Sequence, residues 1–269
     1  MRAKWLLSTT ACVLLVLAAC GSNDTSDPGS GSTSAAGATT ELTVFAASSL
    51  TAAFTQIGSD FEATNPGATV TFNFGPSGDL AAAIGSEGTA DVFASASGTY
   101  MDEVGDEVGV SGRADFVRNE LVIITPPDDP ANISSLQDLA TPGVQLVLAA
   151  EGVPVGDYAR QALGTAGIAD AVLANVVSNE EDDAAVVARI TAGEADAAIV
   201  YVSDVTSAVA TQVNAVGIPD SVNVIATYPI AVVAGSPHAD LAQAFVDYVT
   251  GPAGEATLAD FGFLLPPSM

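Results

Sequence analysis

The chain has 269 residues, of which 32 are acidic and only six are basic, so its formal net charge is −26. Nucleic acid is excluded as a partner, because no basic patch is available to displace counterions from the phosphates. Hydrophobic residues make up 49% of the chain, and a chain of this length can bury one large core or two modest ones.

The N-terminus has the pattern of an export signal, which we assign to residues 1–19. Arg2 and Lys4 form a positive region, and the apolar run behind them is too short for a mature membrane-spanning helix. Residues 17–20, Leu-Ala-Ala-Cys, resemble the lipobox of bacterial lipoproteins, which implies cleavage before Cys20 and lipidation of its thiol. The alternative is an ordinary secretory signal in which Cys20 is incidental. The other cysteine would be removed with the signal, so no disulfide is expected.

Residues 20–41 are rich in Gly, Ser, Thr, Ala and Asp and have almost nothing to bury. Such a segment cannot offset the entropy that ordering would cost, so we expect a flexible tether. The expected arrangement is an exported protein that is lipid-anchored at the outer face of the cell membrane.

From residue 42 onward, short apolar runs bounded by Gly and Pro alternate with helical patterns. The predicted strands are 42–47, 70–74, 90–94, 121–124, 144–148, 197–201 and 230–233. Apolar stripes with helical spacing lie within 50–61, 80–84, 186–190 and 241–249, and Pro154 suits a first helical position. The alternation predicts an α/β fold in which mostly parallel sheet is flanked by helices.

Two lobes are expected rather than one. The proline-rich segment 126–130 interrupts the series of strands and helices, and a polar stretch at 212–223 precedes the terminal strand and helices. We therefore predict lobe I from residues 42–123 plus 228–269 and lobe II from residues 124–227, with the ligand in a cleft between them.

Polar positions follow the C-terminal ends of four predicted strands. They are Ser48-Ser49, Ser77-Gly78, the turn at 153–156 and Tyr201. Ligands of open α/β sheets bind outside these strand ends, where helix N-termini also present unpaired N–H groups. Because basic residues are so scarce, we expect an anion bound there to be held by neutral dipoles.

At these positions the sequence resembles the molybdate-binding proteins, the solute-binding components of ATP-driven molybdate importers. The matching stretches are 43–50, 74–78, 90–96, 119–122, 153–159, 181–182, 199–204, 228–233 and 261–263. No single stretch is specific, but the ordered series covers essentially all of residues 42–265. The resemblance implies a two-lobed type II periplasmic-binding-protein fold. It also implies that a monomer without a cofactor delivers molybdate or tungstate to an ABC permease and its ATPase.

The resemblance further implies which residues bind the oxyanion. They are Ser49, Ser77, Val155, Asp183 and Tyr201. The two serines would give hydroxyls, Val155 and Asp183 backbone N–H groups, and Tyr201 its phenol O–H, so molybdate would meet neutral donors only. Taken alone, the serines are more typical of helix N-caps, and it is the ordered resemblance that favours them as ligands. The Asp183 carboxylate departs from the apolar residue that is common in the family, and it would repel a dianion unless it points away.

Several alternatives stay open. Sulfate is a fully deprotonated dianion like molybdate, whereas phosphate carries a proton near neutral pH and would gain support if Asp79 faced the ligand. A Ser/His hydrolase would depend on His238, the only histidine. The acidic run at 179–183 lacks the alternate spacing and the Gly of a calcium loop. Tyr158 and Tyr201 suit iron only with a supporting histidine, so we expect neither an enzyme nor a resident metal.

Overall fold

The computed structural model describes residues 39–266. The expected export signal, Cys20 and most of the expected tether lie outside these residues. Two residues assigned to the tether, Thr40 and Glu41, belong instead to the first strand, where they pair with Ala68 and Thr69. No helix in the described part of the chain is long and apolar enough to cross a membrane.

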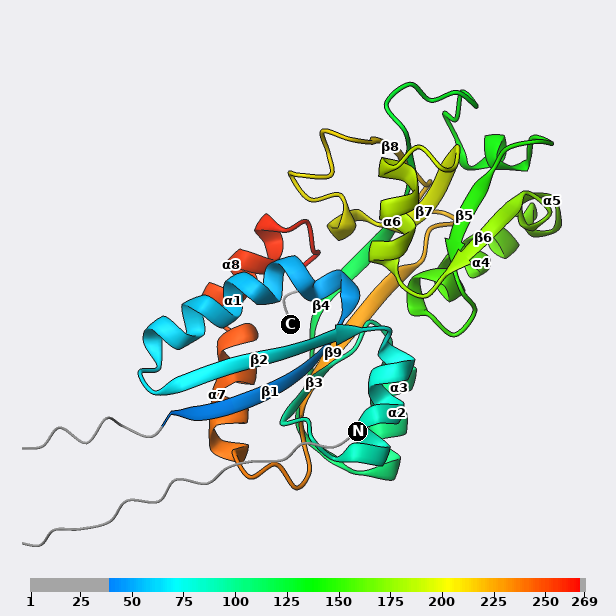
Figure 1. Cartoon of the computed structure of the whole chain (residues 1–269). Coiled ribbons are helices and arrows are strands. Elements are labelled where there is room, and N and C mark those ends of the chain that lie inside the picture. Colours follow the sequence, from blue (N-terminus) through cyan, green and yellow to red (C-terminus); the bar gives the residue numbers. More distant parts are fainter. Residues whose placement is uncertain (1–38, 267–269) are drawn as a thin grey trace, which may run out of the picture. The chain divides into compact units, whose positions relative to one another are not determined.

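One group of parallel strands has β1 at its centre (Figure 1). Its strands are β1 (Thr40–Ala47), β2 (Ala68–Gly75) and β3 (Val92–Ala94). The helices that follow them are the 3-10 helix η1 (Ser48–Leu50) with α1 (Thr51–Thr64), then α2 (Ser77–Glu87) and α3 (Gly98–Glu107). Each strand therefore ends close to the N-terminus of a helix.

A second group of parallel strands has β5 at its centre. Its strands are β5 (Leu146–Ala149), β6 (Val176–Glu180) and β7 (Ala197–Tyr201). Its helices are η2 (Leu136–Ala140), α4 (Pro154–Thr165), α5 (Ala169–Leu173), α6 (Asp183–Thr191) and η3 (Val202–Asp204). Every residue of β5 and β7 is buried, as expected for parallel strands that helices cover on both faces.

Two long antiparallel strands, β4 (Val110–Thr125) and β9 (Ile225–Val233), connect the groups (Figure 1). The first part of β4 pairs with β9, which in turn pairs with β3, while the last residues of β4 pair with β7 and with β8 (Asn214–Gly217). Helices α7 (Ala239–Val249) and α8 (Pro252–Asp260) complete the described chain. The predicted α/β class is confirmed, with antiparallel pairing confined to the contacts of β4 and β9.

The apolar stripe predicted within 50–61 forms the buried face of α1. Phe54 is fully buried at its centre, and its ring lies 5.9 Å from that of Phe116 and 6.1 Å from those of Phe72 and Phe245. These partners come from β2, β4 and α7, so one helical stripe joins three segments that are distant in sequence. This packing fixes the start of α1, and with it the serines before it, against the sheet.

Some elements differ from the sequence expectation. β4 begins eleven residues before the predicted strand at 121, because its polar first part is held by pairing with β9 rather than by apolar side chains. β6 and β8 contain no buried residue and carry no long apolar run. The turn expected at 153–156 is the first turn of α4.

Candidate functional site

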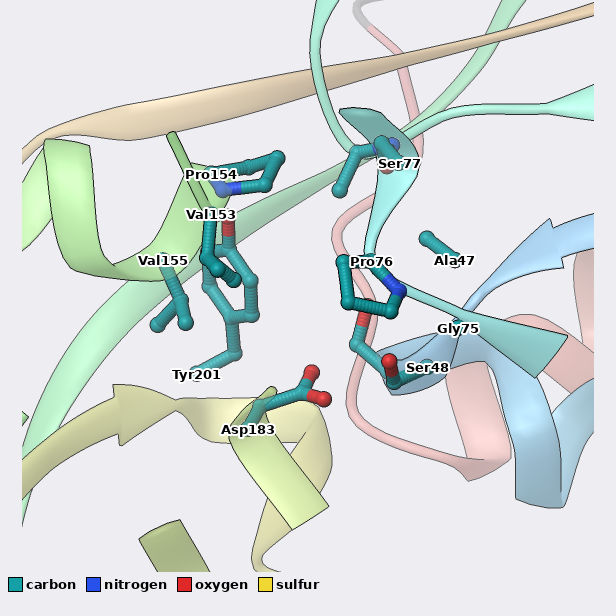
Figure 2. Close-up of a pocket in the computed structure, with 12 residues that line it drawn as sticks. Ala47, Ser48, Gly75, Pro76, Ser77, Val153, Pro154, Val155, Asp183 and Tyr201 are labelled. Atoms are coloured by element: carbon teal, nitrogen blue, oxygen red, sulfur yellow. The ribbon is translucent and has the colours of Figure 1, made fainter. Parts of the chain in front are cut away.

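A small pocket lies where the C-terminal ends of strands from both groups meet helix N-termini (Figure 2). About 210 Å³ of space at the pocket, part of it open solvent, is not filled by atoms. Its lining residues are Ala47, Ser48, Ser49, Gly75, Pro76, Ser77, Ala96, Val153, Pro154, Val155, Asp183 and Tyr201. All five residues that the family resemblance implied as oxyanion ligands are among them, although they are spread along the sequence from Ser49 to Tyr201. None of the described residues that line the pocket is a Lys, Arg or His.

Ser49 lies in η1 directly behind β1 and is 8% exposed. Its Oγ is 3.0 Å from the Oη of Tyr228, a residue of β9. Neither Ser48 nor Ser49 caps the helix with its side chain, so the interpretation of these serines as N-caps is not supported. The Ser49 hydroxyl is held against the sheet instead.

A buried chain of hydrogen bonds sets the direction of the Ser49 hydroxyl. The Oδ1 of Asn119 accepts the backbone N–H of Glu120 at 3.0 Å, which fixes the Asn119 amide with its Nδ2 toward Tyr228. Nδ2 then donates to Tyr228 Oη at 3.3 Å, so Tyr228 can direct its own proton to Ser49. In that arrangement the Ser49 proton is available to a ligand in the pocket.

Ser77 begins α2, and its hydroxyl is oriented in the same sense. Its side chain is 1% exposed, and its Oγ accepts the backbone N–H of Ala96 at 3.0 Å. Pro76, not Ser77, is the N-cap of α2, and the helix has no side-chain cap. Ser77 therefore keeps its own proton for a ligand, beside the unpaired N–H groups of the first helical turn.

Val155 is the second residue of α4, where its backbone N–H belongs to the first turn. The close approach of α4 to the end of β5 requires glycine at the next position. A Cβ on Gly156 would lie 2.4 Å from the carbonyl oxygens of both Ala149 and Ala150. Arg160 secures the same junction by donating to the carbonyl oxygens of Ala149 and Gly156 at 2.8 Å.

Tyr201 ends β7 with its ring extending into the pocket (Figure 2). The residue is 1% exposed, and burial raises the pKa of its phenol well above the usual value. The neighbouring Tyr228 hydroxyl is engaged with Ser49 and Asn119. Within residues 39–266 no group makes a hydrogen bond to the Tyr201 hydroxyl. A buried hydroxyl without a partner is costly, and this one belongs to a residue that lines the pocket.

Asp183 is the first residue of α6, after the N-cap Asp182, and its side chain does not point away from the pocket (Figure 2). The residue is 4% exposed, and its Oδ1 accepts the backbone N–H of Ala184 at 3.1 Å. Burial, followed by the charge of Asp182, raises the pKa of Asp183 to about 6. Asp204 lines an adjoining cavity together with Asp183, and burial together with the Asp183 charge raises the pKa of Asp204 well above its usual value.

Residues from the alternative interpretations lie elsewhere. Asp79 is exposed in the first turn of α2 and does not line the pocket. His238 precedes α7, also outside the pocket. The described residues contain no group of three or more His, Cys, Asp or Glu side chains arranged to hold a metal ion. Tyr228 and Asn119 were in the stretches that resembled the family, but no sequence pattern indicated the hydrogen bonds that link them to Ser49.

Strand ends, helix N-termini and neutral donors around a small pocket are the features of a protein that binds a small polar solute. A family model described as bacterial extracellular solute-binding protein matches residues 42–264. The molybdate-binding protein ModA of Mycobacterium tuberculosis (strain ATCC 25618 / H37Rv) is 39% identical over 268 residues, which is 98% of this chain and 100% of the relative. ModA of Escherichia coli (strain K12) is 32% identical over 84% of this chain and 89% of its own length.

Solved structures agree in fold. The periplasmic molybdate-binding protein of Azotobacter vinelandii matches with a TM-score of 0.75 at 20% identity, over 84% of this chain and 99% of that one. The sulfate-binding protein SubI from Mycobacterium tuberculosis H37Rv matches with a TM-score of 0.74 at 18% identity, over 85% of this chain and 88% of that one. This chain belongs to the molybdate-binding protein (ModA) family of bacterial extracellular solute-binding proteins, which confirms the resemblance found in the sequence.

Proposed function

We propose that the protein captures a tetrahedral oxyanion, molybdate or tungstate, and delivers it to an ABC permease that an ATPase drives. The observation that carries the proposal is the buried Tyr201 hydroxyl, which has no partner among the described residues and lines a pocket with two serine hydroxyls and two helix N-termini. These groups are donors, and a fully deprotonated oxyanion offers only acceptors.

Neutral donors suit a chain of this charge. Backbone N–H groups at helix N-termini carry partial positive charge and bind anions without a basic side chain. Ser49, Ser77 and Tyr201 add three hydroxyl donors, two of them oriented by hydrogen bonds from behind. The names of the relatives in two bacterial species, molybdate-binding protein ModA, support molybdate as the ligand.

Release to the permease requires the pocket to open. We propose two lobes, residues 42–123 with 228–269 and residues 124–227, that close on the anion as hinged domains. Each group of parallel strands would be the centre of one lobe, and β4 and β9 would carry the hinge. The proposal extends to export through residues 1–19, attachment of the mature protein to the membrane through lipidated Cys20, and action as a monomer.

Calorimetric titration of the purified protein with molybdate, tungstate, sulfate and phosphate tests the proposal. We expect saturable heat with molybdate and tungstate, and a rise in melting temperature, since a ligand at 100 times its dissociation constant stabilises by about 2.7 kcal/mol. The function would be refuted if none of the four anions produced heat of binding or raised the melting temperature. A Ser49→Ala, Ser77→Ala double variant should lose binding, while His238→Ala, outside the pocket, should bind as the natural protein does.

A further inference from the structure

Two neighbouring carboxyl groups stand at the edge of the pocket. Asp183, at the start of α6, is buried and lines the pocket, and Asp204, in η3, is half-buried and lines an adjoining cavity together with Asp183. Asp204 also accepts the backbone N–H of Tyr201 at 2.8 Å, which ties the pair to the residue with the unpartnered hydroxyl. The pair is thus built into the framework of the pocket.

The surroundings of Asp183 contain acids and phenols but no cation among the described residues. The titratable groups that face it are Asp182, Asp204, Tyr201 and Tyr228. Arg189, on the same helix as Asp183, pairs with Glu180 and Glu194, and Arg160 pairs with Glu151 and donates to two backbone carbonyl oxygens. η1 and β5, which also pack against α6, contribute no charged side chain.

A dianion and an ionised Asp183 cannot share this pocket at low cost. Water would screen their repulsion only weakly, because Asp183 is 4% exposed, and no described cation lines the pocket to offset it. A protonated Asp183, in contrast, would offer one more O–H donor to the anion, beside those of Tyr201 and the serines. The anion itself therefore favours protonation of the pair.

Solvent can reach the pair from its other side. A second cavity shares Ser48, Ser49 and Asp183 with the pocket and is also lined by Ser203 and Asp204. Asp183 lines both spaces and Asp204 lines the second cavity alone, so a proton can enter from the second cavity while the anion occupies the first.

We propose, on the basis of the function above, that the Asp183–Asp204 pair takes up one proton from solvent when the oxyanion enters, so that Asp183 contacts the anion as a neutral hydrogen-bond donor. No bond other than an O–H bond forms, and the buffer supplies the proton. Oxyanion capture is thereby linked to pH through a side chain that was expected to contribute only its backbone N–H.

The sign of the effect follows from the pKa of Asp183, which is about 6 in the unliganded protein. Above this pH the pair must gain a proton on binding, so the dissociation constant for molybdate should rise by up to tenfold per pH unit. An Asp183→Asn variant keeps the shape, needs no proton, and should bind about 100-fold more tightly than the natural protein at pH 8, since that pH lies about two units above the pKa.

The experiment is calorimetric titration of molybdate into the full mature chain from pH 6 to 8.5, in pairs of buffers with different ionisation enthalpies. We expect about one proton taken up per anion at pH 8, and none for Asp183→Asn. Asp79→Asn is the matched control, because Asp79 is also in the first turn of a helix but is exposed outside the pocket, and it should keep the natural pH profile.

The outcomes separate the two proposals. Molybdate binding that does not vary with pH and takes up no proton would overturn this inference alone, as would an Asp183→Asn variant that binds more weakly by the same factor at every pH. If neither the natural protein nor Asp183→Asn bound molybdate at any pH, the proposed function itself would be overturned. The proton count on the natural chain needs no variant, so it decides the question even if Asp183→Asn does not fold.

Discussion

Replacing Tyr201 by Phe should change stability and affinity in opposite directions. The hydroxyl is buried and has no hydrogen-bond partner within residues 39–266, so the unliganded protein bears the cost of an unsatisfied polar group, about 1–3 kcal/mol. Tyr201→Phe removes that cost and keeps the ring. Because each kcal/mol shifts the melting temperature by roughly 2–4 °C in a chain of this size, the unliganded variant should melt several degrees higher.

Binding should show the opposite effect. A hydrogen bond to a charged partner contributes about 1.5–3 kcal/mol, and 1.4 kcal/mol is a factor of ten in affinity, so the variant should bind molybdate at least about tenfold more weakly. Thermal unfolding without ligand and calorimetric titration with molybdate measure the two effects on the same preparations. A residue with a merely structural role would not produce this combination.

Tyr228→Phe is the matched control, since it removes a phenol hydroxyl from the same buried region. That hydroxyl is bonded to Ser49 and Asn119, so its loss leaves paired groups unsatisfied and should lower the free energy of unfolding by about 1–3 kcal/mol. A Tyr201→Phe variant that melts lower than the natural protein, or that binds molybdate unchanged, would refute the assignment of Tyr201 as a ligand donor.

Three further changes have defined outcomes. Ser77→Ala removes an anion donor and also the acceptor of a buried backbone N–H. Calorimetric titration should therefore show about tenfold weaker binding, and denaturant unfolding should show a free energy of unfolding lower by about 1–3 kcal/mol. Gly156→Ala places a Cβ 2.4 Å from two carbonyl oxygens and should cost about 1–3 kcal/mol with loss of affinity, whereas Gly164→Ala, on the same helix in open space, should stabilise by up to about 1 kcal/mol. The raised pKa of Asp183 means that the folded state binds more protons than the unfolded state; unfolding free energy measured without ligand should therefore fall as pH rises from about 4 to above 6, and less steeply in Asp183→Asn.

Local sequence was sufficient for much of the fold and for the convergence of the pocket. β7 has the predicted bounds, because the short apolar run that begins directly after Asp196 suits a strand covered on both faces. The polar residues at the ends of such strands meet at one edge of the sheet, so the pattern of strands and helices was enough to place Ser49, Ser77 and Tyr201 together.

Groups that act from a distance in sequence could not be predicted in this way. Tyr228 reaches Ser49 from β9, and Asn119 lies in the polar part of β4, which has no apolar pattern of its own and depends on pairing with β9. The contact between Asp183 and Asp204 likewise depends on α6 and η3 packing together, and residue type alone suggested that a carboxylate would avoid an anion pocket. Local pattern determines where a strand ends, whereas the partners of its last side chain depend on tertiary pairing.

The acidity of the chain and its proposed ligand are reconciled by the protonation of a single side chain. Two unit charges about 4 Å apart interact by about 4 kcal/mol at the effective dielectric constant of a protein, so an ionised Asp183 would oppose a dianion by roughly twice that amount. One hydrogen bond to a charged group contributes only about 1.5–3 kcal/mol, so several of the pocket's donors would be needed to cancel this repulsion. Protonation at pH 8 of a group whose pKa is about 6 costs only about 2.7 kcal/mol. Neutralising Asp183 is therefore the less costly route by which this pocket can accept a dianion.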